Sequence, residues 1–245
     1  MTIVGIRRED KNEWERRVPL IPADLADLRD RYGLDVIVQP SAIRAYTDDE
    51  FRAAGIDVRE SLEDAGVVFA VKEIPVELLQ ADTTYAFFSH VIKGQSYNMP
   101  MLARLMELGC SLVDYETIVD DLGRRLIFFG VHAGYAGMIE GAWCMDQRLA
   151  GRGRPSPFAS VRHAWEYRDL EEVREHLERI AEVTRGADSA AEPLIVGVAG
   201  YGNVSRGAPE ILGWLGAEEV AVDDRSDLAS GRAAAPAPLL TAVFK

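Results

Sequence analysis

The sequence predicts an α/β protein in which a doubly wound substrate domain precedes a Rossmann-like nucleotide-binding domain. Over residues 2–115, short apolar segments rich in Val, Ile and aromatic residues alternate with helical patterns, which is typical of a mostly parallel sheet. A glycine-rich turn between an apolar strand and a helix comes late, near residue 200. Hydrophobic residues make up 48% and charged residues 27% of the chain, an ordinary globular composition.

The substrate domain is expected to cover residues 1–131. Its first helix begins at Pro22, because proline suits the first helical turn, and ends at Gly33. Two further helices are expected at 48–54 and 98–108. Five apolar segments predict the strands of the sheet, at residues 2–6, 34–38, 65–71, 85–89 and 111–113. A sixth strand is expected at 124–129, after a turn at 121–123.

Helices that bridge two domains are expected over residues 132–191. A Gly/Ala-rich helix runs over 132–149, and a charged amphipathic helix over 168–184. The nucleotide-binding domain then occupies residues 192–245, beginning with an apolar strand at 194–198.

The turn Gly200-Tyr-Gly202 follows that strand directly and leads into a helix. Gly200 permits the tight turn, and Gly202 lets the backbone approach a pyrophosphate. The helix start at Asn203 and Val204 presents free N–H groups and a positive dipole end to that pyrophosphate. The third glycine is displaced to Gly207, so the dinucleotide-binding pattern is only partly met.

Asp223 and Asp224 end a strand expected at 219–222, about 20 residues beyond the glycines. A carboxylate there accepts a hydrogen bond from the ribose 2′-hydroxyl and repels a 2′-phosphate, which favours NAD over NADP. The alternative is a pair of solvated turn aspartates.

Polar residues stand at the ends of the apolar strands of the first domain. Lys72 ends one strand, and His90 and Lys93 follow the next. The carboxyl ends of parallel strands face a common crevice, so Lys72 and His90 can converge there as an acid and a base. Arg17 lies just ahead of the first helix. The alternative interpretation is that each of these residues belongs to an ion pair on the protein surface.

The formal net charge is −13, with a sequence pI near 4.8, which argues against nucleic-acid binding. A few local arginines would still allow anionic small substrates. No apolar run approaches the roughly 20 residues of a membrane span, and the N-terminus does not resemble a signal peptide. We therefore expect a cytoplasmic protein. Cys110 and Cys144 lack metal-site spacing and are expected as buried free thiols, with no metal site.

With these segments in place, the sequence resembles the saccharopine dehydrogenases, most closely the lysine–ketoglutarate reductase domain, within the alanine dehydrogenase and transhydrogenase group. The resemblance extends over essentially the whole chain. It rests on five stretches, namely Gly5-Ile-Arg-Arg-Glu-Asp-Lys-Asn-Glu-Trp-Glu-Arg-Arg17, Tyr85-Ala-Phe-Phe-Ser-His-Val-Ile-Lys93, Leu112-Val-Asp-Tyr-Glu116, Phe129-Gly-Val-His-Ala-Gly-Tyr-Ala-Gly-Met138 and Gly200-Tyr-Gly-Asn-Val-Ser-Arg-Gly207.

The resemblance implies a reductive condensation of lysine with 2-oxoglutarate to saccharopine, or its reverse, with NAD or NADP as cofactor. It makes Lys72 and His90 the acid–base pair of the imine steps. Lys93 belongs to the same substrate site, and Glu116 is placed to tune the pKa of Lys72. Arg17 is expected to hold a substrate carboxylate, and the second arginine of this kind is Arg125 or Arg124.

The family's nucleotide domain continues beyond the point where this sequence stops, at or just before the expected third strand. The sequence is therefore expected to be a fragment or a short form with uncertain turnover. Two other functions stay open: an alanine dehydrogenase-like enzyme with a smaller substrate, and a non-catalytic module that binds an amino acid. The sequence leaves the reaction direction and the oligomeric state open.

Overall fold

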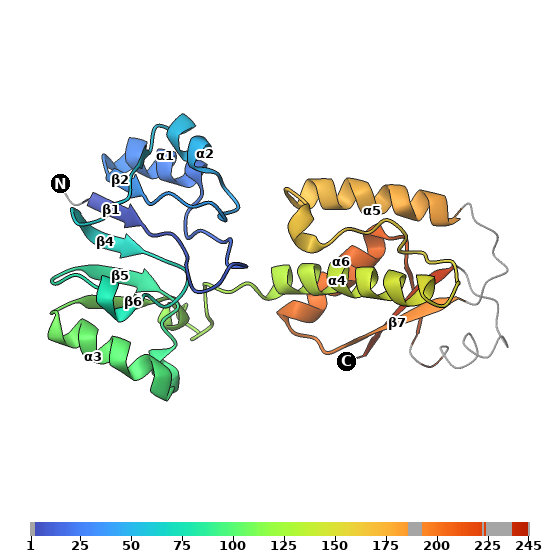
Figure 1. Ribbon diagram of the computed structural model, residues 1–245. Coiled ribbons are helices and arrows are strands. Elements are labelled where there is room, and N and C mark those ends of the chain that lie inside the picture. Colours follow the sequence, from blue (N-terminus) through green and yellow to red (C-terminus); the bar gives the residue numbers. More distant parts are fainter. Residues whose placement is uncertain (1–2, 186–192, 222, 224–236, 245) are drawn as a thin grey trace. The chain divides into compact units, whose positions relative to one another are not determined.

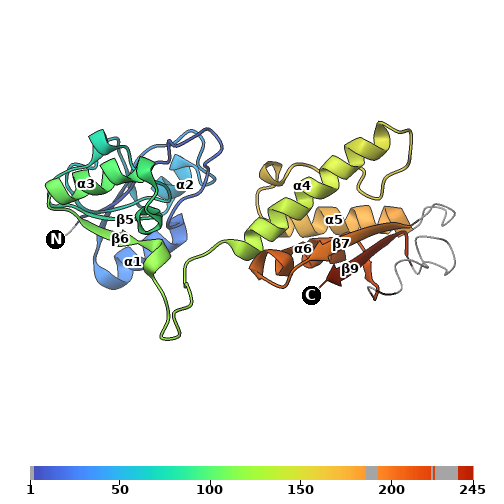
Figure 2. The same cartoon turned by 90° about the horizontal axis from the view of Figure 1, so that it is seen from below.

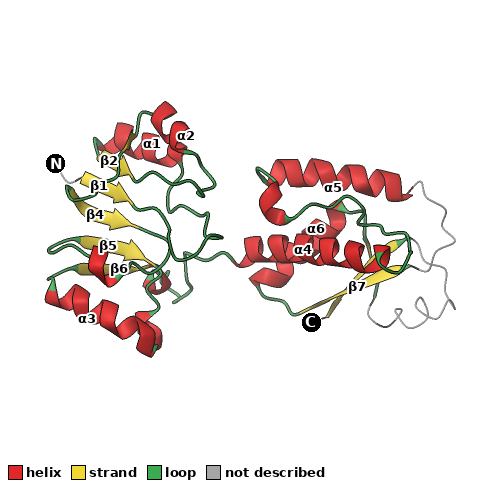
Figure 3. Ribbon diagram, in the orientation of Figure 1, coloured by secondary structure: helices red, strands yellow, loops and turns green. Residues whose placement is uncertain are grey.

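The computed structural model describes residues 3–185, 193–221, 223 and 237–244. The chain divides into two compact units, residues 1–128 and 129–245 (Figure 1). Each unit combines parallel strands with helices (Figure 3), which confirms the predicted fold class.

The first unit contains a six-stranded parallel sheet in the order β3-β2-β1-β4-β5-β6. The order reverses between β1 and β4, which makes that point the topological switch of the sheet. The strands are β1 (Ile3–Ile6), β2 (Asp35–Val38), β3 (Asp57–Val58), β4 (Ala65–Phe69), β5 (Thr84–Phe87) and β6 (Ser111–Asp114).

Helices cover both faces of this sheet. The helices are α1 (Pro22–Tyr32), α2 (Asp48–Ala53) and α3 (Met99–Glu107). Successive side chains of β2 point to opposite faces: Val38 packs in a cluster with Leu25 of α1 and Phe51 of α2, whereas Ile37 packs in one with Met101 of α3. The sheet is therefore doubly wound, as predicted.

The strand predicted at 124–129 is wrong. The segment after β6 forms a tight turn in which the Asp120 amide donates to the Arg124 carbonyl (2.9 Å), and only a single bridge joins Val119 to Arg125. Leu126 and Phe128 are 58% and 48% exposed, and in Figure 2 the segment projects from the sheet of the first unit. The apolar pattern predicts a strand here, but hydrophobicity does not show whether a neighbouring strand is available for pairing.

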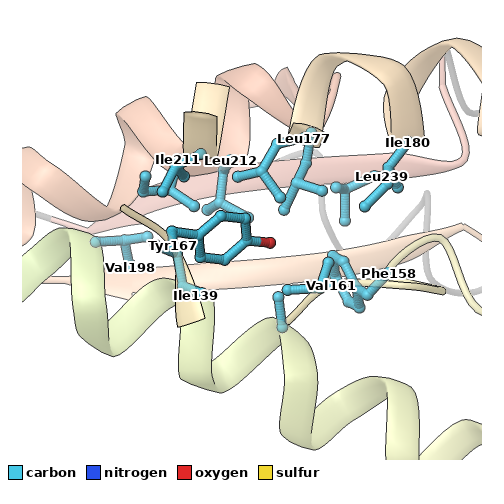
Figure 4. Packing of buried hydrophobic residues seen from close by; sticks show 13 residues of the cluster. Ile139, Phe158, Val161, Tyr167, Leu177, Ile180, Val198, Ile211, Leu212 and Leu239 are labelled. Atoms are coloured by element: carbon cyan, nitrogen blue, oxygen red, sulfur yellow. The ribbon is translucent and has the colours of Figure 1, made fainter. Parts of the chain in front are cut away.

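The second unit is built from α4 (Gly130–Ala150), α5 (Leu170–Arg185), β7 (Leu194–Ala199), α6 (Asn203–Trp214), β8 (Glu218–Glu219) and β9 (Leu239–Phe244). Its core joins side chains from all three helices and from the sheet (Figure 4); among them are Ile139, Leu177, Val198, Ile211 and Leu239. Helices α4 and α5, expected to bridge two domains, thus contribute to the core of this unit.

The sheet of the second unit has the order β7-β9-β8, and both pairings are parallel. The third strand, expected to be absent or only beginning, is present as the six-residue β9 and occupies the centre. The strand expected at 219–222 is observed as β8, and the Val220 amide still donates to the Thr241 carbonyl of β9 (2.9 Å). Val222 lies outside the described residues.

Helices α4 and α6 lie side by side, and their backbones touch at two glycines. A Cβ atom on Gly134 would lie 2.1 Å from the carbonyl oxygen of Val204, and one on Gly207 would lie 2.3 Å from that of Val131. Both distances are far inside van der Waals contact. Gly207, the displaced third glycine of the turn motif, is therefore required by helix–helix packing.

Two further findings concern the surface. Cys110 is half-buried and Cys144 is exposed, so the expectation of two buried thiols is wrong for Cys144. Within the described part of the chain, the helices are too short or too polar to span a bilayer.

Candidate active site

The carboxyl-terminal edge of the first sheet gathers ionisable side chains. Glu9 follows β1, Lys72 follows β4, His90 follows β5 and Glu116 follows β6. These four strands are consecutive in the sheet. Parallel strands deliver their carboxyl ends to one edge, and ligands bind there near the topological switch. The predicted pair Lys72 and His90 therefore follows two adjacent strands.

Glu116 is the centre of one cluster at this edge. Its side chain is only 3% exposed, and one oxygen, Oε2, lies 2.8 Å from Nδ1 of His90. The other oxygen, Oε1, lies 2.9 Å from Nζ of Lys93 and also accepts from Nη2 of Arg125. Arg125 further donates from Nε to the Glu116 carbonyl at 3.2 Å. Three residues named by the sequence thus contact the carboxylate of a fourth.

The charge state of Glu116 favours one tautomer of His90. Burial raises the pKa of the Glu116 carboxyl, but hydrogen bonds from Lys93, His90 and Arg125 outweigh burial and lower the pKa to about 2. The carboxyl is then ionised at neutral pH and can only accept hydrogen bonds. Nδ1 of His90 lies 2.8 Å from Oε2 of Glu116 and 2.9 Å from Nζ of Lys93. The contact with the ionised carboxylate is a hydrogen bond when Nδ1 carries the proton, and neutral His90 in this tautomer has its lone pair on Nε2.

A second cluster surrounds Lys72. The buried carboxylate of Glu9 accepts from the backbone amides of Val71 (2.7 Å) and Lys72 (2.9 Å). Glu15, also buried, accepts from Nε (2.7 Å) and Nη2 (2.6 Å) of Arg17. Burial raises the pKa of the Glu15 carboxyl, but Arg17 and the charge of Lys72 lower it below its ordinary value.

Glu15 is therefore the acid whose ionisation responds to Lys72. Glu116, expected to tune Lys72, instead has His90, Lys93 and Arg125 as its described partners. Arg124 does not join either cluster: its Nε lies 2.7 Å from Oδ2 of Asp120, in the exposed turn.

Sequence reasoning missed Glu73, which lies next to Lys72. Its Oε2 lies 2.7 Å from Nζ of Lys11, and within the described structure its Oε1 is buried without a hydrogen-bond partner. Burial raises the pKa of this carboxyl, but the hydrogen bond from Lys11, with a smaller contribution from the charge of His90, lowers it overall. An acid directly after the predicted Lys72 was the signal available in the sequence.

The low pKa of Glu116 predicts a stability effect at acid pH. A folded-state pKa of about 2, against an ordinary 4.5, means that ionised Glu116 stabilises the fold by about 3 kcal/mol above pH 5. This contribution is lost as the pH falls through 4.5 towards 2, because the unfolded chain takes up the proton first. We expect Glu116→Gln to be less stable than the wild type near neutrality, and the two proteins to converge near pH 2.

Urea unfolding of both proteins between pH 2 and 7 measures this difference. Glu107→Gln serves as the matched control, since Glu107 is an exposed residue of α3. A constant difference between wild type and Glu116→Gln over the whole range would contradict the prediction.

The turn after β7 leaves open space at the amino-terminal end of α6. Gly200 has φ 106°, a conformation that favours glycine. Gly202 is the N-cap of α6 and makes no side-chain cap, so the N–H groups of the first turn point outward. A Cβ atom on Gly202 would have no described atom within 4 Å. The packing of the chain therefore does not require glycine at 202, whereas close approach of a ligand would.

The predicted ribose-binding acids are only partly described. Asp223 is exposed in a turn beyond β8, and Asp224 lies outside the described residues. Asn203 and Val204, both named for the cofactor, begin α6 and are exposed.

A comparison with protein-family models assigns about half of the chain to a known family. The model of the alanine dehydrogenase/PNT N-terminal domain matches residues 5–136. The chain belongs to this family. That match spans the six-stranded sheet and both ionisable clusters, and the resemblance stated from the sequence is confirmed.

Curated relatives extend the similarity into the second unit. The chain is 37% identical over 217 residues to alpha-aminoadipic semialdehyde synthase of Arabidopsis thaliana and 38% identical over 220 residues to the mitochondrial enzyme of that name of Rattus norvegicus. These alignments cover 86% and 89% of the chain but only 20% and 24% of the relatives. Saccharopine dehydrogenase [NAD(+), L-lysine-forming] of Yarrowia lipolytica is 31% identical over 147 residues, which are 57% of the chain and 40% of that enzyme.

Solved structures share the fold. An L-alanine dehydrogenase superposes on 100% of the chain with a TM-score of 0.60 and 20% identity, and the match covers 61% of that protein. The transhydrogenase from Sinorhizobium meliloti superposes on 98% of the chain with a TM-score of 0.52 and 14% identity, and covers 61% of that protein.

Proposed function

We propose that this chain carries the substrate site and the beginning of the nucleotide-binding domain of an NAD(P)-dependent oxidoreductase that interconverts lysine plus 2-oxoglutarate and saccharopine. The proposal rests on the positions of Lys72 and His90 at the ends of two adjacent strands, with hydrogen-bonded acidic side chains around them. The similarity to alpha-aminoadipic semialdehyde synthases and saccharopine dehydrogenases supports the substrate assignment.

Proton transfer is the task of Lys72 and His90. When the ε-amine of lysine attacks the keto carbon of 2-oxoglutarate, the amine loses protons and the keto oxygen leaves as water. In the proposed site, Nε2 of His90 and Nζ of Lys72 give and take these protons. Glu116, in contact with Nδ1, would keep the lone pair of neutral His90 on Nε2, and the charge of Lys72 contributes to the lowered pKa of Glu15.

Substrate carboxylates would bind to the cations of the site. Lys93 and Arg125 share the single carboxylate of Glu116, which leaves an excess of positive charge there. Arg17 donates from Nε and Nη2, along one side of its guanidinium, to the two carboxylate oxygens of Glu15 and is oriented by that pair. These three side chains are the proposed carboxylate ligands, and the exposed Arg124 is the weaker candidate.

The cofactor is proposed to bind at Gly200, Gly202, Asn203 and Val204, with the ribose near Asp223 and Asp224. A bound nicotinamide dinucleotide would supply the hydride that reduces the imine carbon. The acidic pair favours NAD, because a carboxylate repels the extra phosphate of NADP.

Replacement of Gly202 by alanine tests the diphosphate site. We expect Gly202→Ala to fold with wild-type stability, since the added methyl group meets no described atom of the chain. It should weaken NADH binding at least about tenfold by blocking the approach of the diphosphate to the backbone. Calorimetric titration with NADH measures the affinity, and Gly213→Ala, in the exposed part of α6, is the control. Equal affinities of the two variants would contradict this assignment.

A single assay compares the candidate functions. The chain is mixed with NADH or NADPH, lysine and 2-oxoglutarate, and the absorbance of the reduced cofactor is followed; the assay is repeated with pyruvate and ammonia. Oxidation with the first pair supports the proposed function. Oxidation with only the second pair supports an alanine dehydrogenase-like enzyme, the alternative favoured by the structural likeness to L-alanine dehydrogenase.

A non-catalytic module is the third candidate. The chain spans only about a fifth to a quarter of the semialdehyde synthases that it matches. Calorimetric binding of lysine or 2-oxoglutarate without oxidation of either cofactor would support a module that binds the amino acid and lacks hydride transfer.

A further inference from the structure

The loops that carry His90 and Glu116 both form hydrogen bonds to one buried side chain, which belongs to neither cluster described above. Asp114 ends β6 and is 5% exposed. Its Oδ2 accepts from the hydroxyl of Ser89, the residue before His90. Its Oδ1 accepts from the backbone amide of Glu116 at 2.9 Å. The two oxygens of one carboxylate therefore hold the two loops that carry the histidine and its partner.

The loop after β5 needs such support. His90 has φ 56° and ψ 12°, a left-handed conformation that is strained for a residue with a Cβ atom. The preceding Ser89 is fully buried: its hydroxyl also accepts from the Val91 amide (3.3 Å), and its carbonyl accepts from Nδ2 of Asn98 (2.9 Å). These contacts prevent the loop from relaxing to an ordinary conformation.

We infer that Asp114 is a positioning residue, which sets the 2.8 Å contact between Nδ1 of His90 and Oε2 of Glu116 and thereby the tautomer of His90. Asp114 acts through Ser89 and through the Glu116 amide and does not itself handle substrate protons. The inference rests on the proposed acid–base role of His90, which requires the lone pair on Nε2.

The tautomer of His90 is measurable without turnover. In protein with ¹⁵N-labelled histidine, at about pH 9 where unperturbed imidazoles are neutral, the ¹⁵N shifts distinguish a protonated Nδ1 from a protonated Nε2. His90→Gln identifies the His90 signals among those of the four histidines. The wild type is expected to carry the proton on Nδ1.

Four variants separate positioning from general stability. Asp114→Ala removes both acceptors and should lower the ratio of Nδ1–H to Nε2–H tautomer about tenfold. Ser89→Ala removes one of the two hydrogen bonds to the Asp114 carboxylate and should give a smaller change in the tautomer ratio. Asp114→Asn should keep the wild-type ratio, because its amide oxygen accepts from Glu116 and its NH₂ donates to Ser89. Thr117→Val is the control, since the Thr117 hydroxyl donates to the backbone carbonyl of Asp114 (2.8 Å) and not to its carboxylate.

A shifted ratio in Asp114→Ala, with Asp114→Asn and Thr117→Val unchanged, supports the positioning role. A folded Asp114→Ala protein with the wild-type ratio overturns it, as does a wild-type protein with the proton on Nε2. If Asp114→Ala does not fold, Ser89→Ala decides: an unchanged ratio there overturns the inference. Failure of the proposed function would appear separately, as wild-type protein with the Nδ1–H tautomer and no oxidation of NADH or NADPH.

Discussion

Replacing Gly134 by alanine is expected to destabilise the second unit by about 2–3 kcal/mol, because the new methyl group would lie 2.1 Å from the Val204 carbonyl oxygen. The neighbouring atom is backbone, so relief requires α4 and α6 to move apart. Gly207→Ala should act in the same way, since its methyl group would lie 2.3 Å from the Val131 carbonyl oxygen. Urea unfolding monitored by circular dichroism gives the change in stability.

Each variant has a matched control in its own helix. Gly137 of α4 and Gly213 of α6 are exposed, and no described atom lies within 4 Å of a Cβ placed on either. Alanine at these positions should stabilise the protein by up to about 1 kcal/mol, because alanine favours the helix over glycine. Equal effects of Gly134→Ala and Gly137→Ala would show that the helix contact is looser than described.

Lys72→Met is expected to lower the rate of NADH oxidation with lysine and 2-oxoglutarate by about 10²–10⁴-fold, in protein that catalyses this reaction. Methionine keeps the length of the side chain but carries no proton. The backbone of residue 72 is held by Glu9, and the substitution leaves that hydrogen bond in place. The fold should therefore persist, and the loss should appear in kcat as well as in kcat/KM.

Arg52→Met is the control for the loss of one surface cation. Arg52 lies on α2, where it pairs with Asp49 in an exposed ion pair, and its replacement should leave turnover unchanged. Near-normal rates in Lys72→Met would show that the proton carrier lies elsewhere in the site.

The sequence predicted the first sheet well for identifiable reasons. Ile37 and Val38 are both buried although they point to opposite faces, which is the continuous apolar pattern of a parallel strand covered on both sides. Helix α1 has its limits at Pro22 and Gly33, two residues whose backbone preferences are local. Where local preference and burial agree, sequence alone was sufficient.

Strand pairing was harder to predict. The apolar segment at 124–129 resembled a strand, yet Leu126 and Phe128 are exposed and only one bridge forms. Conversely, residues 239–244 follow an Ala/Pro-rich segment and form the central strand β9. Pairing depends on partners distant in sequence, which a local pattern does not contain.

The sequence predicted where the ionisable residues lie but not which of them are in contact. Lys72 and His90 were expected at neighbouring strand ends because polar residues after parallel strands lie at one edge of the sheet. Which acid serves which base depends on the reach of side chains across loops. Glu116 therefore contacts His90. Glu15 and Glu73 were missed, although Glu15 lies two positions before Arg17 and Glu73 directly follows Lys72.

The central place of β9 has a consequence for biosynthesis. Strands β7 and β8 each pair with β9 and not with one another. A chain emerging from the ribosome gains its amino-terminal parts first, so the six-stranded sheet can form while the later one still lacks its middle member. The glycine turn that follows β7 then acquires its final support only when residues 239–244 have been translated, so this turn is completed after the first sheet.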